Sequence, residues 1–434
     1  MSTDTPPGGH GTARPLMLAG ARLADGRAVD VRISGGRIEA VGAAGGLRAA
    51  DRVDLTGYLL LPAPVEPHAH LDEAFTASDA PGPGEALGPG GTLGPGGISP
   101  GADTAESAHR RVTEAALLGL GHGAVVQRTQ VRIGGVRALA RLEGALAAGR
   151  SLRGLMELQV VALPGPLTGG QGAQGRALLR EALAMGAHAV GGCPDLVRDP
   201  DPTEFLRIAA GLAAEAGRPL DLHTDARDRL RFARLTEALA DVLSRLPTGA
   251  VLGPCPGLGL LTRDALARAA DRLAVAGITV TCLPQGEHCV GSAAGPVSAR
   301  LPVRELRAAG VTVAAGSGAL RDRANPVGRP DPLEAAFLLA SGGALDPEAA
   351  YACVSGAARE VLGLPPVRVE AGFPADLLAV RGEDLRGALS SGHSRVVLHG
   401  GRIVSRTSAV RDYADADGPA VPRQGRGGGP GRPT

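Results

Sequence analysis

Eight short apolar runs alternate with segments of helical period through the middle of this chain, and this alternation constrains the fold most. Runs buried on both faces are typical of parallel strands. The runs cover residues 58–65, 123–131, 155–162, 187–192, 219–223, 250–253, 278–283 and 311–316. The helical segments between them include 104–120, 176–185, 202–216, 228–246, 262–276 and 303–309. This α/β pattern predicts a closed (β/α)8 TIM barrel. A doubly wound open sheet is the alternative, but no Gly-x-Gly-x-x-Gly turn follows the first strand.

Both ends of the chain carry short alternating strands with the same turn, Gly-Gly-Arg-Ile, at Gly35–Ile38 and at Gly400–Ile403. Paired glycines supply the positive φ angles of a tight hairpin. We therefore expect the two ends to pair into a small β-sandwich domain beside the barrel. The predicted organisation is a disordered leader at 1–14, a composite β-domain at 15–57 and 366–410, a barrel at 58–365, and a disordered tail at 414–434.

Composition narrows the functional classes. Hydrophobic residues make up 44% of the chain, charged residues 21%, and the formal net charge is +1. These values fit a soluble protein with a small-molecule substrate, and they argue against nucleic-acid or membrane partners. Five scattered cysteines without a CxxC spacing, and no signal or membrane-spanning segment, predict a cytoplasmic protein with reduced thiols. The oligomeric state, a homo-oligomer included, stays open.

Every basic residue in the sequence is arginine, because no lysine occurs among its 434 residues. This absence excludes Schiff-base chemistry, a P-loop lysine and a carbamylated lysine bridging two metal ions.

Three histidines follow predicted barrel strands. His68 and His70 lie two residues apart, so their side chains point the same way from an extended backbone. His223 follows the fifth strand. Because the carboxyl ends of barrel strands meet at one mouth, we expect these imidazoles to converge on a site for one divalent ion, zinc or iron. A metal-free mouth with hydrogen-bonded histidines is the alternative.

Other polar residues are predicted near the same mouth. Gln159 is a candidate for binding a substrate amide, since its amide donates and accepts at once, or else for a bond to backbone inside the barrel. Arg132 could bind an anionic group, or pair with Asp72 or Asp225. Asp225 is the candidate catalytic base, or an orienting partner of His223. Weaker candidates for a ligand or an acid are Cys255, Cys282, Cys289, Glu287 and His288.

The chain resembles the amidohydrolase superfamily in its cytosine-deaminase-like branch. The resemblance is carried by residues 65–72 (Val-Glu-Pro-His-Ala-His-Leu-Asp), 157–164, 221–225, 321–328 and 371–377, and it extends from about residue 15 to about 406. It implies a metal-dependent barrel that displaces ammonia from cyclic amidines. The branch uses no carbamylated lysine, which agrees with this sequence.

The chain departs from the pattern of that branch at the mouth. Where the branch has a proton-shuttling Glu after His-x-Asp, this chain has Ala226. The branch's His after strand six is replaced at Pro254, and Gly318 stands where the branch has a metal-binding Asp after strand eight. The branch has the pattern Arg-Thr-His-Val-Asp after strand two, whereas this chain has Arg-Thr-Gln-Val-Arg at residues 128–132. Two hypotheses therefore stand: metal-dependent hydrolysis of a C–N bond in a small cyclic amidine or amide, or a catalytically degenerate relative that binds a small molecule or a partner.

Overall fold

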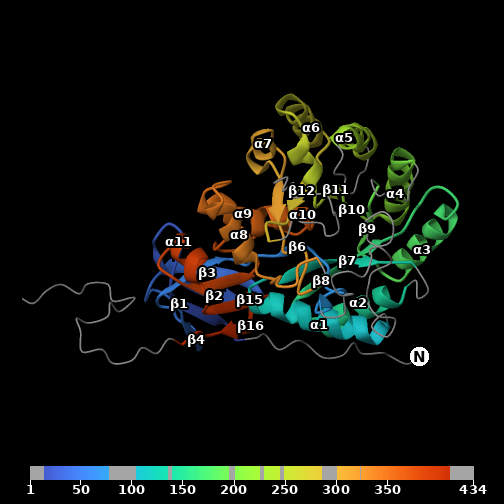
Figure 1. The fold of residues 1–434 in the computed structure, drawn as a ribbon. Helices are drawn as coiled ribbons and strands as arrows, with labels where there is room; N and C mark the ends of the chain where they lie inside the picture. The colour runs from blue at the N-terminus through green and yellow to red at the C-terminus, as the bar shows by residue number, and fades with distance from the viewer. Residues whose placement is uncertain are drawn as a thin grey trace, which may run out of the picture.

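Two sheets organise the protein in a computed structural model (Figure 1). The structure describes residues 14–77, 104–134, 139–194, 201–224, 229–244, 249–285, 301–322 and 324–410. The predicted tail, all but the last residue of the predicted leader, and the candidates Asp225, Ala226, Glu287, His288 and Cys289 lie outside these residues. Within them, no helix has the length and apolar content needed to cross a membrane.

The second sheet consists of eight parallel strands in chain order, and seven of the eight predicted apolar runs supply strands of it. Its ends meet where Gly318 O accepts from His70 N at 2.9 Å and Gly318 N donates to His68 O at 3.0 Å, so the barrel closes. The strands are β6 (Glu66–Ala69), β7 (Val126–Arg132), β8 (Glu157–Leu163), β9 (Ala189–Gly192), β10 (Leu220–Leu222), β11 (Ala250–Leu252), β12 (Thr279–Cys282) and β13 (Val313–Ala315).

Helices surround the barrel, and those numbered from α4 to α7 lie on the side away from the first sheet (Figure 1). Capping residues in the sequence determine where these helices begin and end. Before α4, for example, Asp201 accepts from the backbone N–H of Glu204, and Gly217 ends the helix at φ 61°. The helices are α1 (Ala105–Gly121), α2 (Ala140–Ser151), α3 (Gly172–Ala184), α4 (Pro202–Ala216), α5 (Arg229–Leu243), α6 (Arg263–Val275), α7 (Val303–Ala308), α8 (Pro332–Ser341), α9 (Pro347–Val354), α10 (Gly356–Val361) and α11 (Leu385–Ser391), with a 3-10 turn, η3 (Pro256–Leu260).

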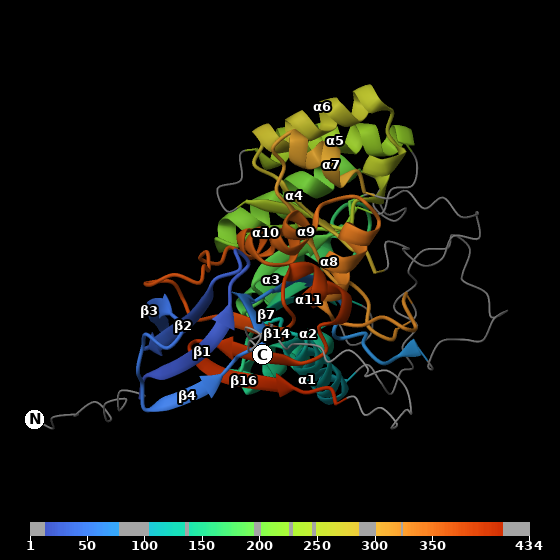
Figure 2. The same cartoon turned by 90° about the vertical axis from the view of Figure 1, so that its left-hand side faces the viewer.

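The first sheet is mixed and combines both ends of the chain (Figure 2). Its strand order is β16-β15-β14-β5-β1-β2-β3, with β4 paired to β1. The strands are β1 (Leu16–Arg22), β2 (Ala28–Ser34), β3 (Arg37–Ala43), β4 (Asp51–Asp54), β5 (Tyr58–Pro62), β14 (Leu377–Arg381), β15 (Arg395–His399) and β16 (Arg402–Thr407). The exact domain boundaries stay a prediction.

One predicted strand was wrong. The apolar run at 58–65 was expected to be the first barrel strand, but β5 pairs with β14 in the first sheet, and the barrel begins with β6. The run is apolar throughout because β5 separates two cores. Leu60 packs into the core of the first sheet, whereas Leu59 and Leu61 pack into the barrel core. Periodicity alone does not reveal which sheet a strand with two buried faces will join.

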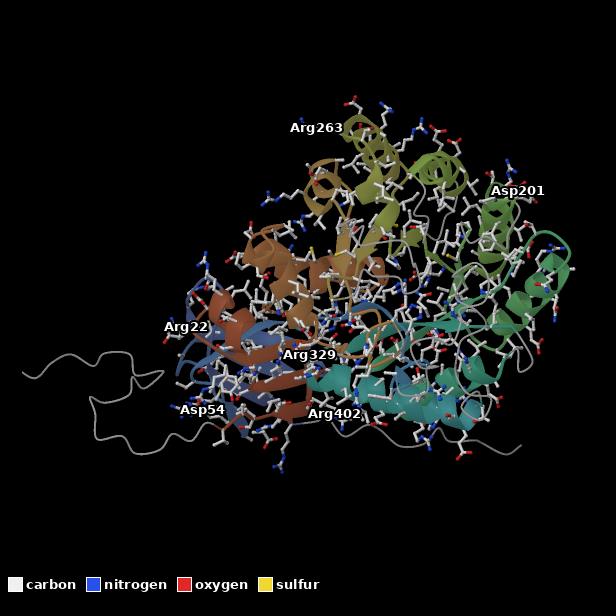
Figure 3. The ribbon with its side chains drawn as sticks, viewed as in Figure 1. Arg22, Asp54, Asp201, Arg263, Arg329 and Arg402 are labelled. Carbon is white, nitrogen blue, oxygen red and sulfur yellow. The ribbon has the colours of Figure 1, made fainter. Side chains whose placement is uncertain are left out.

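The two Gly-Gly turns meet in space. Gly36 and Gly401 have φ angles of 77° and 76°. A Cβ added to Gly401 would lie 3.0 Å from the Cα of Gly36, so side chains would separate the turns. One turn connects β2 to β3 and the other connects β15 to β16, and these two pairs lie at opposite ends of the strand order. Since the turns nevertheless touch, the sheet curls over a single apolar core. Charged side chains such as Arg22, Asp54, Asp201, Arg263 and Arg402 are exposed on the outside of the molecule (Figure 3).

Candidate metal centre

His68 lies on strand β6 and His70 directly after it, and both face the inner side of the barrel. All four residues of β6 are buried, and the carboxylate of Glu66 accepts from the backbone N–H groups of His68 and Ser317 at 3.0 Å or less. Burial raises the pKa of Glu66 to about 7, although these hydrogen bonds oppose the rise. Glu66 thereby fixes β6 to the loop after β13, at the seam where the barrel closes.

His223 leaves β10 on the same side, anchored by a hydrogen bond of 2.8 Å from its backbone N–H to the carbonyl of Gly192. The nitrogen atoms offered by His68, His70 and His223 all lie within 4.8 Å of one another. The Nε2 atoms of His70 and His223 are 3.2 Å apart. Among the described parts of the chain this is the cluster that could hold a metal ion, and it brings together the three histidines that the sequence predicted.

The three imidazoles are neutral. Burial lowers the pKa of His68 and of His223 well below the ordinary value, and it lowers that of His70 to about 4. After burial, the neighbouring rings lower two of these pKa values further, because a charge on one ring would repel a charge on the next: His70 acts on His68, and both His68 and His70 act on His223. Neutral imidazole is the form that binds a metal ion.

The polar atoms of these rings fit a metal ion. Both ring nitrogens of His68 and the Nδ1 of His223 are buried, with no hydrogen-bond partner among the described residues. Two nitrogens bound to one tetrahedral zinc ion at 2.0–2.1 Å would lie about 3.3 Å apart. The 3.2 Å between His70 and His223 agrees with that separation. A divalent ion would therefore satisfy buried atoms that the described protein groups leave unsatisfied.

A buried ion pair lies beneath the histidines. Arg128 of β7 donates to Asp221 of β10 at 2.9 Å, and the other carboxylate oxygen of Asp221 is 3.9 Å from Nδ1 of His68. Burial raises the pKa of Asp221, and Arg128 and Gln130 partly offset the rise. A carboxylate facing the second nitrogen of a ligating histidine commonly fixes the ring orientation. The sequence analysis missed this pair, although the two-residue period from Arg128 to Arg132 signals one inward face.

Gln159 lies deeper in the barrel than the sequence suggested. It pairs in register with Arg128, four residues before the end of β8. Its Oε1 accepts from Nε and a terminal nitrogen of Arg128 at 3.0 and 2.7 Å, and its Nε2 donates to Leu362 O at 3.2 Å. These contacts agree with the alternative that Gln159 is tied inside the barrel, and a substrate-binding role stays a prediction.

Arg132 lies at the mouth, at the end of β7. Its Nε is 3.4 Å from the carboxylate of Glu73, which is also 3.4 Å from Arg141. The sequence analysis named Asp72 or Asp225 as its partner and missed Glu73. The Arg132 side chain remains 25% exposed, so it can still meet a ligand. After burial, its charge is a further cause of the lowered pKa of His223.

Two of the replaced positions, Gly318 and Pro254, lie in the described structure and contact neighbouring residues. Gly318 has φ 71°, and an added Cβ would lie 2.9 Å from Cδ1 of Leu283. The carbonyl of Pro254 accepts from the hydroxyl of Thr224 at 2.9 Å, and that hydroxyl lies 3.0 Å from Sγ of Cys255. Cys255 and Cys282 are buried, and neither belongs to the histidine cluster. No carboxylate joins the three histidines in that cluster of the described structure.

Comparisons with known proteins agree with this geometry. The amidohydrolase family model matches residues 108–405. The N-isopropylammelide isopropyl amidohydrolase of Pseudomonas sp. is 28% identical over 219 residues, which cover 48% of this chain and 52% of that protein. The chain thus matches about half the length of that curated relative.

Solved structures resemble the chain over most of its length. The N-isopropylammelide isopropylaminohydrolase of Burkholderia multivorans has a TM-score of 0.78 and 28% identity, covering 91% of this chain and 99% of its own. The 5-methylcytosine deaminase of Klebsiella pneumoniae, liganded with 5-fluorocytosine, has a TM-score of 0.77 and 23% identity, covering 92% and 99%.

Proposed function

Since this chain belongs to the amidohydrolase family, in the cytosine-deaminase-like branch that its motifs predicted, we propose that it hydrolyses a C–N bond in a small cyclic amidine or amide. The observation that carries the proposal is the convergence of three neutral imidazoles, one buried and two half-buried, on one point at the barrel mouth. The names of the similar proteins support the substrate class, because each describes removal of an amine from a nitrogen heterocycle.

His68, His70 and His223 would hold one divalent ion, zinc or iron. When bound, that ion would act as a Lewis acid and lower the pKa of a water molecule. Burial keeps the three ligands neutral, and the carboxylate of Asp221, which pairs with Arg128, faces Nδ1 of His68 at 3.9 Å. We propose Asp225, two residues after His223 in the sequence, as the base that moves the proton to the leaving amine.

Arg132 is the proposed substrate-binding cation. It is partly exposed beside the histidines and shares Glu73 with Arg141, so its guanidinium is held in place while its outer edge stays accessible. A guanidinium donates hydrogen bonds to carbonyl oxygens, and to a carboxylate or phosphate it can donate two in parallel. It would bind the oxygen-bearing edge of the heterocycle and turn the scissile carbon toward the histidines.

A second candidate function is favoured by Gly318. The resemblance places an anionic metal ligand there, and glycine offers none. A three-imidazole site without a carboxylate ligand binds a divalent ion less tightly. The chain would then be a catalytically degenerate relative that uses the same mouth to bind a small molecule or a partner.

Metal content and amine release separate the two candidates. Purified protein would be analysed for bound zinc and iron, and then assayed for release of ammonia or alkylamine from a panel of aminopyrimidines and aminotriazines. The proposed function requires about one metal ion per chain, with turnover that is lost in His70→Ala and kept in the exposed variant His393→Ala. Metal binding without any turnover would favour the degenerate relative.

A further inference from the structure

The histidine cluster has no anionic ligand among the described residues, and Gly318 offers none. A divalent ion bound by three neutral imidazoles keeps its full positive charge. In a mostly buried site, such a charge is costly unless an opposite charge lies nearby. The affinity of the site for an ion therefore depends on the charged side chains that surround the cluster.

Arg132 puts a positive charge beside this site. The parallel register of β6 and β7 sets Ala69 opposite Thr129, so Arg132 is level with the turn that follows His70. Behind the larger effects of burial and of other charges, the guanidinium lowers the pKa of both His70 and His223. A charge that disfavours a proton on these rings also disfavours a metal ion bound to them.

Glu73 lies next to both Arg132 and His70. The chain turns back after β6, and the backbone N–H of Glu73 donates to the carbonyl of His70 at 3.2 Å. The Glu73 carboxylate is 3.4 Å from Nε of Arg132. Among the charges that act on the pKa of His70, that of Glu73 is the largest, and it opposes the lowering caused by burial. Glu73 therefore outweighs Arg132 at this ring.

The other described carboxylates near the site are committed elsewhere. That of Asp221 pairs with Arg128 at 2.9 Å, and that of Asp72 is buried 3.5 Å from Arg141. Two more accept hydrogen bonds from backbone N–H groups, Glu66 and Asp322. Of these described carboxylates, that of Glu73 is the one that reaches the open mouth, with 22% of its side chain exposed.

We propose that Glu73 neutralises Arg132 at the barrel mouth, so that the histidine site can hold a divalent ion beside a substrate-binding guanidinium. Arg132 and the ion carry like charges, and without an anion beside them each would weaken the binding of the other. Arg141 lies 3.4 Å from the Glu73 carboxylate and holds it from the side of α2. The inference rests on the proposed function, because it concerns the ion that this function requires.

Zinc binding to the metal-free protein tests this charge balance. Zinc would be titrated against a competing chelator into the wild type, Glu73→Gln, Arg132→Gln and the double variant. Glu73→Gln keeps the size of the side chain and removes its charge, so zinc affinity should fall by roughly tenfold or more. Arg132→Gln should instead bind zinc more tightly than the wild type. The double variant should bind zinc about as the wild type does, because no cation remains to be neutralised.

Glu39→Gln is the matched control, since Glu39 pairs with Arg32 in the first sheet, and it should leave zinc affinity unchanged. A Glu73→Gln variant that binds zinc like the wild type would overturn the inference, as would weaker binding by Arg132→Gln. An equal loss from Glu73→Gln with and without Arg132 would also overturn it, because Glu73 would then act on the ion by itself. If the wild type binds no zinc, the proposed function fails and the inference falls with it.

Discussion

His70 and His223 face each other through Nε2 atoms only 3.2 Å apart, although 153 positions separate them in the chain. In the absence of an ion, one ring must donate to the other. Replacing that hydrogen bond by two bonds to a metal needs no movement of either strand, because the separation already agrees with shared tetrahedral coordination. The barrel therefore holds the two ligands ready before an ion arrives.

Removing one of these rings should abolish tight metal binding. We expect His223→Ala to retain at most about one hundredth of the zinc affinity of the wild type, since two imidazoles remain of three. Emission spectrometry after dialysis against a weak chelator measures the metal content. His393→Ala serves as the control because this histidine is exposed and outside the cluster. Equal metal retention in His223→Ala and wild type would contradict the site.

Breaking the buried ion pair beneath the histidines should be strongly destabilising. Arg128→Met leaves the carboxylate of Asp221 buried and without its cation, and we expect a loss of about 3–5 kcal/mol in the free energy of unfolding. The double variant Arg128→Met with Asp221→Leu should recover most of that loss. Denaturant unfolding measures both. In the partly exposed pair of Arg32 and Glu39, Arg32→Met should have little effect.

Stability should fall as the pH rises through the range in which His399 loses its proton. A hydrogen bond to Asp376 at 3.0 Å raises the pKa of His399 above its ordinary value of 6.5. The folded state then binds the proton more tightly than the unfolded state, so this stabilisation is complete below about pH 6.5 and disappears above the raised pKa.

The variant His399→Gln tests this dependence. It should be less stable than the wild type by roughly 1–3 kcal/mol below about pH 6.5, and the difference should shrink toward about pH 9. Thermal unfolding across the pH range measures it, with the exposed His393→Gln as control. A stability difference that does not change with pH would show that His399 acts through packing instead of charge.

Restoring a carboxylate at Gly318 should lower the stability of the metal-free protein and raise its affinity for a metal ion. Gly318→Asp forces a side chain into a backbone with φ 71°, 2.9 Å from Leu283, while it adds an anionic group beside the histidines. We expect the metal-free variant to lose about 1–2 kcal/mol for the backbone, with a further loss from the contact. The zinc affinity should rise.

Gly363→Asp is the matched control for this substitution. Gly363 has φ 69° and nothing within 4 Å of an added Cβ, so it reports the backbone cost without the contact. The difference between the two variants in unfolding free energy isolates the effect of Leu283. Zinc affinity that stays at the wild-type value in Gly318→Asp would mean that this position cannot reach the ion.

Much of the site could be predicted because it lies on strands. The His-x-His spacing and the strand before His223 determined which face each imidazole occupies, since alternation along a strand is a local property of the backbone. The barrel followed from the alternation of apolar runs with helical segments, seven of which runs became its strands, and the composite sheet followed from the repeated Gly-Gly turns. In each case the pattern lies in residues that are neighbours in the sequence, so it can be recognised without knowing the rest of the fold.

The pairings across the barrel were decided by tertiary structure alone. Nothing near Gln159 in the sequence shows that Arg128 ties its amide, or that Arg128 also pairs with Asp221 across the barrel. Likewise, β5 has the same apolar pattern as a barrel strand, and only its pairing with β14 places it in the other sheet. Strand pairing, burial and hydrogen-bond satisfaction depend on partners far away in the chain, so the sequence determined which chemical groups reach the mouth, and the fold decided which of them remain available to a ligand.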